Sequence, residues 1–133
     1  MMLSGSCLCG AVQYRINGAI GEVVMCHCQR CRKANGSDHA VNAPIQRADF
    51  QLIQGESSLR AYSSSAGVYR VFCGTCGAPL YSKRDADPAH YRLRLGTLDT
   101  PLDQRPSMHI FVASKAEWEQ IADDLPQYAE RPA

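Results

Sequence analysis

Short runs of alternating apolar and polar residues dominate the hydrophobic pattern of this chain. Between positions 12 and 16, Val12, Tyr14 and Ile16 share one face of an extended segment, while Gln13 and Arg15 share the other. Such a period of two is typical of a half-buried strand. Asn17-Gly18 then provides a turn signal. The first well-defined element is therefore predicted to be a strand over residues 11–16.

The same reasoning predicts further short strands separated by turn-forming residues. In residues 91–95, Tyr91, Leu93 and Leu95 are expected to face inward, with Arg92 and Arg94 outward. The other predicted strands cover residues 21–25, 39–43 (ended by Pro44), 50–53, 59–62, 68–72, 79–82 and 108–112, with a loop at 84–88.

One helix is predicted, near the C-terminus. Ser114 and Glu117 have the spacing of a capping box, which favours a helix over residues 115–122. Trp118, Ile121 and Ala122 would form its inner face. Many short strands and one terminal helix indicate a mainly β fold of antiparallel sheets, in a single domain over residues 1–133.

Composition narrows the class of protein. The net charge of +1 and the pI near 7.6 argue against a strongly basic surface for nucleic acid. The start of the chain lacks the pattern of a signal peptide, and no run reaches the roughly eighteen apolar residues of a membrane span. The expected protein is cytoplasmic, with no nucleic-acid or membrane partner.

The seven cysteines divide into four plus three. In a reducing compartment, clustered cysteines are more often metal ligands or catalytic groups than disulfides, and an odd count fits a disulfide framework poorly. Four thiolates complete the tetrahedral shell of a structural zinc, whereas three leave a position open. The sequence therefore predicts two zinc ions per chain, one enclosed and one accessible.

Two separated pairs would form the enclosed site. Cys73-Gly-Thr-Cys76 has the shape of a zinc knuckle, and Cys7-Leu-Cys9 is its expected partner. A metal bound by both pairs would close a long loop and stabilise the fold. The alternative is a set of reduced thiols without metal.

Cys26, Cys28 and Cys31 are predicted to form the open site. In an extended segment Cys26 and Cys28 point to one face, and a turn brings Cys31 toward them, so His27 faces the other way and is expected to support or pack. Two alternatives remain open: a closed zinc site completed by His39 or His109, and a redox pair formed by Cys28 and Cys31.

Basic residues lie within this cluster and directly after it. Arg30, Arg32 and Lys33 are candidates to bind the carboxylates of a small thiol substrate, or simply to offset the charge of the cluster. A thiol entering the open position would be deprotonated by the metal. His27 and His109 are candidates for moving its proton.

With these motifs in view, the chain resembles the glutathione-dependent formaldehyde-activating enzyme family, which includes the relatives of centromere protein V. The resemblance rests on residues 4–12 (SGSCLCGAV), 26–33 (CHCQRCRK), 72–77 (FCGTCG) and 109–115 (HIFVASK), together with Trp118 and residues 123–126 (DDLP). It implies a beta-tent fold with one zinc at Cys7, Cys9, Cys73 and Cys76 and another at Cys26, Cys28 and Cys31.

The activity implied by this resemblance is that of a carbon-sulfur lyase, which joins glutathione and formaldehyde into S-(hydroxymethyl)glutathione. Zinc at the open site would take the thiol as a ligand before the thiolate attacks the aldehyde carbonyl, so Cys26, Cys28 and Cys31 would act through the metal. Two rival hypotheses are a non-catalytic zinc-binding interaction module and a thiol redox protein that uses Cys28 and Cys31.

Overall fold

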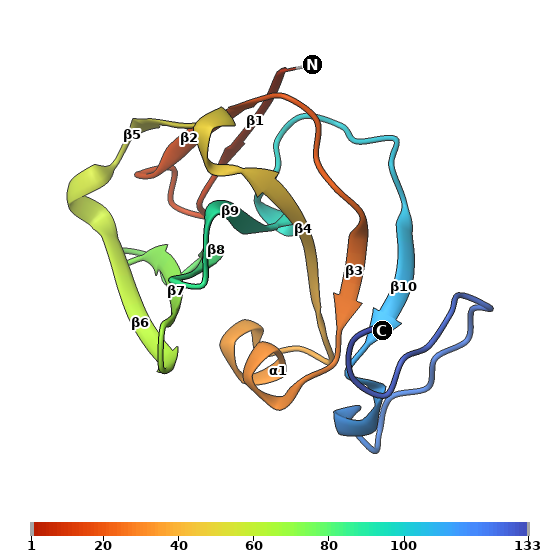
Figure 1. The fold of residues 1–133 in the computed structure, drawn as a ribbon. Helices are drawn as coiled ribbons and strands as arrows, with labels where there is room; N and C mark the ends of the chain where they lie inside the picture. The colour runs from red at the N-terminus through yellow and green to blue at the C-terminus, as the bar shows by residue number, and fades with distance from the viewer. Residues whose placement is uncertain (1, 133) are drawn as a thin grey trace.

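The computed structural model describes residues 2–132, whose strands form two sheets (Figure 1). The small sheet has the order β1-β2-β5, with β1 at Met2–Ser6, β2 at Gln13–Asn17 and β5 at Phe50–Gln54. The large sheet has the order β10 (Pro106–Ile110), β3 (Val23–Cys26), β4 (Ala40–Gln46), β9 (Asp87–Arg94), β8 (Pro79–Arg84), β7 (Val68–Cys73) and β6 (Leu59–Ser65).

Strand pairing is antiparallel except between β10 and β3, which run parallel. Short 3-10 turns cover Arg47–Asp49, Glu56–Ser58, Leu95–Thr97 and Val112–Ser114. The prediction of a mainly β fold is confirmed. The loop predicted at 84–88 is shorter in the structure: Arg84 ends β8 and Asp87 begins β9, so only residues 85–86 form the turn between the paired strands.

The hydrophobic core lies between the two sheets. Tyr14 and Ile16 of β2 are buried, as are Ile45 of β4 and Leu93 of β9 from the large sheet. Tyr14 also stacks on Phe50 of β5, with ring centroids 5.3 Å apart. The apolar face of each alternating strand is therefore used to join the sheets, as the period of two predicts.

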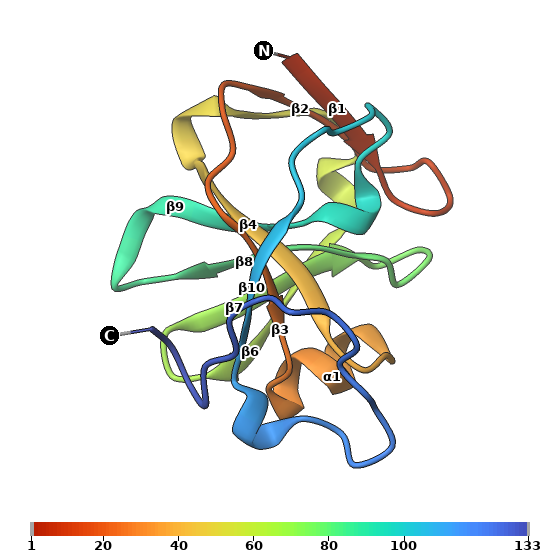
Figure 2. The same cartoon turned by 90° about the vertical axis from the view of Figure 1, so that its right-hand side faces the viewer.

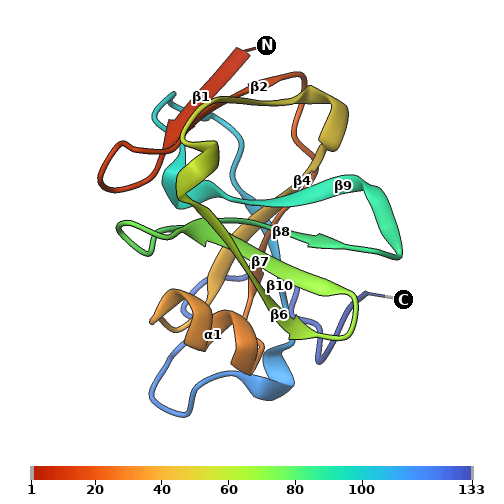
Figure 3. The ribbon, with the colours of Figure 1, turned by 90° about the vertical axis from the view of Figure 1, so that its left-hand side faces the viewer.

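The opposite face of the large sheet is hollow. Residues from all seven of its strands line one cavity, and these include both edge strands, β10 and β6. A flat sheet could not bring its two edges to one cavity, so the sheet curls around it. Figure 3 shows the hairpins β6–β7 and β8–β9 between the small sheet and the helix.

The only α-helix in residues 2–132 is α1, Gln29–Asn35, directly after the CHC motif. Its N-cap is Cys28, whose sulfur accepts the amide hydrogen of Cys31 at 3.3 Å. Gly36 ends it with φ +63°, a left-handed conformation that glycine adopts without strain. None of the helices among the described residues has the length and hydrophobicity needed to span a membrane.

Pro44 does not end its strand, contrary to the sequence prediction. Its carbonyl accepts the amide hydrogen of Gly21 at 2.8 Å, and the N and O atoms of a strand residue point to the same side. The missing amide hydrogen of Pro44 therefore faces Gly21 rather than β9. The ladder between β4 and β9 continues to Gln46.

The predicted helix over residues 115–122 is absent. That segment is irregular, and Trp118 is 71% exposed instead of packed inward. A helix of two turns is marginal in water without a buried face. Here the side chain of Glu119 instead lies against His27, with Oε2 2.9 Å from Nδ1.

Residues 126–130 run along β10 in place of a packed helix (Figure 2). The amide of His109 donates to the carbonyl of Pro126 at 2.9 Å, and the amide of Tyr128 donates back to His109 at 2.9 Å. The amide of Phe111 donates to Glu130 at 2.8 Å. This C-terminal segment thus covers the edge of the large sheet.

Candidate metal centres and an arginine-lined cavity

Two loops bring four cysteine sulfurs together at one end of the core. Cys7 and Cys9 follow β1, whereas Cys73 ends β7 and Cys76 precedes β8. Their sulfurs all lie within 4.8 Å of one another. The Sγ atoms of Cys7 and Cys9 are 3.6 Å apart, and those of Cys9 and Cys73 are 3.9 Å apart.

The two loops are built alike. The amide of Cys7 donates to Val12 at 3.0 Å, and that of Cys73 donates to Ala78 at 3.0 Å. In each loop a glycine with φ +81°, Gly10 or Gly77, returns its amide to the carbonyl of the first cysteine. Because L side chains rarely adopt this φ, glycine permits the tight turn that converges the thiols.

This four-sulfur group fits a tetrahedral zinc ion. With Zn–S bonds of about 2.3 Å, neighbouring sulfurs should be about 3.8 Å apart, close to the spacing found here. Backbone amides near Ala78 and Cys9 also lower the pKa of Cys76 to about 6. Stabilising the thiolate form prepares the sulfur for a cation.

The three-cysteine group lies at the other end of the large sheet. Cys26 ends β3, Cys28 caps α1 and Cys31 lies in the first turn of α1. Their sulfurs also lie within 4.8 Å of one another, and no fourth Cys, His, Asp or Glu among residues 2–132 joins the group. Three thiolates around one point would leave a tetrahedral ion one position short.

The charge of the three-cysteine group is unevenly shared. Hydrogen bonds from Cys26 and Cys31 lower the pKa of Cys28 to about 2, whereas hydrogen bonding with Cys28 and Cys31 raises the pKa of Cys26. The Arg70 guanidinium lies 3.7 and 3.8 Å from the Cys31 sulfur through its two Nη atoms. This cation offsets negative charge that accumulates on the sulfurs.

The three-cysteine group opens into the cavity enclosed by the large sheet, which has a volume of about 390 Å³. Among residues 2–132, Glu22 is the only acidic residue in the lining of this cavity. Six arginines line it as well: Arg30, Arg70, Arg84, Arg92, Arg94 and Arg131. Several buried polar atoms of its wall have no hydrogen-bond partner among the described residues: Asn42 Oδ1, Ser64 Oγ, Arg70 Nε and Arg92 Nη1. Ser64, Arg70 and Arg92 thus offer unpaired hydrogen-bond donors, and together with the positive charge of the wall these suit an anionic ligand.

Arg92 and Arg94 do not face solvent as the alternation of β9 predicted. Arg94 is only 6% exposed, and both side chains line the cavity. The period of two was correct, but the polar face of β9 is enclosed by the curled sheet. In the strand register, Ser82 of β8 pairs with Arg92 of β9 on one side and with Arg70 of β7 on the other. The two arginines therefore lie on either side of Ser82. The repeated arginines on the polar faces of successive strands were the sequence signal that could have revealed this cavity.

The three basic residues selected from the sequence separate in the structure. Arg30 lines the cavity. Arg32 donates instead to the backbone carbonyl of Ser114 at 3.1 Å. Lys33 is exposed and is not part of the cavity wall.

The histidines lie behind the three-cysteine group. His27 is completely buried and faces away from the cavity, as its position between Cys26 and Cys28 predicts. Its Nε2 lies 2.8 Å from Nδ1 of His109. Burial lowers the pKa of His27, against the raising effect of Glu119. Neither His39 nor His109 joins the three sulfurs, so neither completes that group.

Comparison with known families fits this arrangement. A sequence model of the glutathione-dependent formaldehyde-activating enzyme family matches residues 2–114, which include all seven cysteines. The chain belongs to this family. The residues beyond 114, which add Arg131 to the cavity wall, lie outside the matched region.

Similar proteins agree with this membership. A Halomonas elongata protein named after the glutathione-dependent formaldehyde-activating enzyme family is 28% identical over 129 residues, covering 91% of this chain and 82% of that protein. An uncharacterized lyase from Schizosaccharomyces pombe is 29% identical over 77 residues, or 58% of this chain and 54% of that protein.

The fold is also found in a solved structure. A Rhodobacter sphaeroides protein aligns with a TM-score of 0.63 and 24% identity, covering 75% of this chain and 91% of the other. At this identity the likeness concerns the fold alone. Family membership relates this protein to enzymes of the formaldehyde-activating type.

Proposed function

We propose that this protein is a zinc-dependent carbon-sulfur lyase that combines a small anionic thiol, such as glutathione, with formaldehyde. The observation that carries the proposal is a three-cysteine group without a fourth protein ligand at the wall of an arginine-lined cavity. Family membership supports glutathione as the thiol and formaldehyde as the aldehyde. Two zinc ions per chain are expected, one at each cysteine group.

The four-cysteine group would hold a structural zinc, and Cys26, Cys28 and Cys31 would hold the second ion. When bound there, zinc would supply a Lewis acid that favours the thiolate form of an incoming thiol. Arg70, which already contacts the Cys31 sulfur, would neutralise part of the added negative charge.

The other arginines would bind and orient the remainder of the thiol. Arg92 offers an unpartnered Nη1 into the cavity, and Arg84 lies on the neighbouring strand β8. Carboxylates pair well with guanidinium groups through two parallel hydrogen bonds. Fixing the carboxylates places the sulfur next to the three cysteines, at the cavity wall.

The chemical step forms one carbon-sulfur bond. The thiol first loses its proton to water, the thiolate sulfur attacks the carbonyl carbon of formaldehyde, the C=O π electrons move to oxygen, and that oxygen then takes a proton back from water. Because thiols add to formaldehyde readily, the main expected contribution of the protein is to hold the two reactants together.

Binding of glutathione by the zinc-loaded protein tests the proposal, measured by isothermal titration calorimetry. Arg92→Gln should weaken binding about 10- to 100-fold, the usual effect of losing a charge-assisted hydrogen bond. Lys83→Gln is the matched control: this exposed side chain lies on β8, outside the cavity wall, and should bind like the wild type.

Formation of S-(hydroxymethyl)glutathione, followed by exchange NMR, tests the reaction itself. The wild type should accelerate exchange, and Cys28→Ser should lose both this acceleration and one zinc ion. Two zinc ions that glutathione cannot perturb, together with no acceleration, would instead identify a non-catalytic zinc module. Isolation of a Cys28–Cys31 disulfide with a single zinc would favour redox chemistry.

A further inference from the structure

A second cluster of metal-ligating side chains lies behind the three-cysteine group. His27 comes from the β3–α1 connection, His39 from the segment just before β4, and Glu119 from the C-terminal segment. One donor atom from each lies within 4.8 Å of the others. The Glu119 side chain is only 9% exposed, and His27 is completely buried.

A chain of hydrogen bonds fixes the orientation of His27. The Asp123 carboxylate only accepts, so Nε2–H of His109, 3.0 Å away, donates to it. In a neutral His109 ring, Nδ1 is then the acceptor for Nε2–H of His27. A neutral His27 is left with a lone pair on Nδ1, which faces Glu119 Oε2 at 2.9 Å. Two acceptors this close need a cation between them.

His39 presents a third potential metal-ligating atom, Nδ1, to the same place. Its Nδ1 is buried and has no hydrogen-bond partner among the described residues. The nearest carboxylate oxygens are Glu119 Oε1 at 3.6 Å and Asp38 Oδ1 at 2.9 Å, the latter outside hydrogen-bonding geometry. His39 Nδ1 therefore makes no hydrogen bond of good geometry among the described residues.

The grouping of these three side chains is compact enough for them to bind one metal ion. For Zn²⁺ with ligand bonds of about 2.0–2.1 Å, tetrahedral donor atoms are about 3.3 Å apart. The Glu119 carboxylate faces both imidazoles, with Oε2 2.9 Å from His27 Nδ1 and Oε1 3.6 Å from His39 Nδ1, and one ligand atom from each of the three residues lies within 4.8 Å of the others. A ligating histidine also normally donates its other ring N–H to an acceptor, as His27 does here.

We propose that His27, His39 and Glu119 form an additional binding site for a divalent transition metal such as Zn²⁺, separate from both cysteine groups. Two imidazoles and a carboxylate are a common ligand set for this ion, and Asp38 or water would complete the shell. The ion would tie the C-terminal segment to β3 and β4. His27 and His39 lie inside the region matched by the family model, whereas Glu119 lies beyond it.

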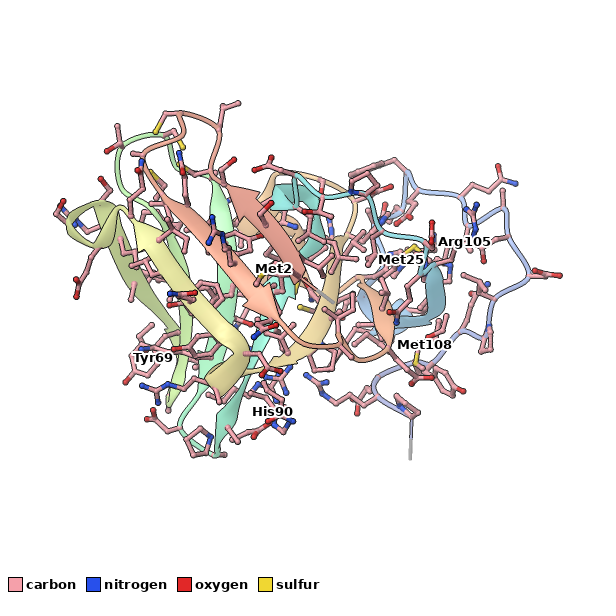
Figure 4. All side chains as sticks on the ribbon, turned by 90° about the horizontal axis from the view of Figure 1, so that it is seen from above. Met2, Met25, Tyr69, His90, Arg105 and Met108 are labelled. Atoms are coloured by element: carbon pink, nitrogen blue, oxygen red, sulfur yellow. The ribbon has the colours of Figure 1, made fainter. Side chains whose placement is uncertain are left out.

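Zinc analysis of the intact, fully reduced chain tests the site. After loading with excess Zn²⁺ and gel filtration, the wild type should retain about three zinc ions per chain, if both cysteine groups are filled. Glu119→Gln and His39→Ala should each lose one ion. His90→Ala is the control: His90 is paired with Asp87, lies far from Met25 of β3 in Figure 4, and should retain all three ions.

Cobalt separates this site from the cysteine groups. Co²⁺ bound by thiolates gives intense charge-transfer absorption, whereas a nitrogen- and oxygen-ligated Co²⁺ does not. The wild type should therefore bind one equivalent of Co²⁺ that adds no charge-transfer band. Glu119→Gln should lose only this equivalent of Co²⁺. Cys28→Ser should lose charge-transfer intensity but still bind the equivalent that has no charge-transfer band.

Two results would overturn the proposal. One is a wild-type protein in which every bound Co²⁺ contributes charge-transfer absorption, which would mean that a proton occupies the space between His27 and Glu119. The other is an unchanged zinc content in Glu119→Gln. The wild-type cobalt titration decides the question even if a variant fails to fold.

Discussion

Replacing one sulfur in each cysteine group should have very different effects on stability. Cys76→Ser removes a ligand from the four-sulfur group, which joins the end of β1 to the end of β7. Cys28→Ser removes a ligand from a group confined to one short segment. The two substitutions are chemically identical, so the difference reports what each group connects.

The expected magnitude follows from the loops that the two groups close. Cys9 and Cys73 are 64 positions apart, and a crosslink over that distance restricts the unfolded chain by about 4 kcal/mol at 25 °C. Cys26 and Cys31 are five positions apart, for which the same relation gives about 2 kcal/mol. For a chain of 133 residues, losing about 4 kcal/mol lowers the Tm by roughly 10–20 °C.

Thermal unfolding followed by circular dichroism measures this difference, at one fixed free-zinc concentration because bound metal shifts the Tm. Cys76→Ser should melt about 10–20 °C below the wild type, and Cys28→Ser should show no more than about half that shift. Thr75→Ser, in the same knuckle but without a ligand change, should melt like the wild type. Equal losses for Cys76→Ser and Cys28→Ser would refute the division into a structural and an accessible group.

Two further predictions concern a turn and a buried phenol. Gly77→Ala should lower the urea midpoint by the equivalent of about 1–2 kcal/mol because φ is +81° there, whereas Gly96→Ala, which needs no left-handed backbone, should leave it unchanged. Burial raises the pKa of Tyr14 to about 12 from 10.0, so the stabilisation from its neutral phenol is complete below pH 10 and is lost as the pH rises toward 12. Over that range the Tm of the wild type should fall more steeply than that of Tyr14→Phe; parallel curves would contradict this reasoning.

The grouping of the cysteines was accessible from the sequence because it depends on local spacing. An extended segment places Cys26 and Cys28 on one face whatever the fold, and a knuckle turn is encoded by Cys73, Cys76 and Gly77 themselves. The orientation of His27 follows from the same local geometry. These features need no knowledge of which strands become neighbours.

The arginine-lined cavity could not be read in the same way. Alternation in β9 separates Arg92 and Arg94 from Leu93, but it does not say whether the polar face meets water or a closed cavity. That depends on the curling of the large sheet, which brings β10 and β6 to the same space. Periodicity assigns residues to a face, and only the long-range pairing of strands determines what that face encloses.

The capping-box pattern at Ser114 and Glu117 failed for a related reason. It describes a favourable helix start, but a helix this short needs a partner surface to be stable. In the structure, backbone pairing of residues 126–130 with β10 and the contact between Glu119 and His27 take precedence. Both interactions connect positions far apart in the sequence, so no local pattern reveals them.

The C-terminal segment has two structural roles, and because both depend on the same short stretch of chain, one change there affects both. Its backbone forms hydrogen bonds with the outer edge of β10, whose unpaired groups could otherwise pair with a strand of another chain. A few residues later it adds Arg131 to the cavity wall. A deletion after residue 125 would therefore be expected to promote self-association and to weaken the hold on anions together. Related proteins whose tails differ in length should accordingly differ both in solubility and in the thiol they prefer.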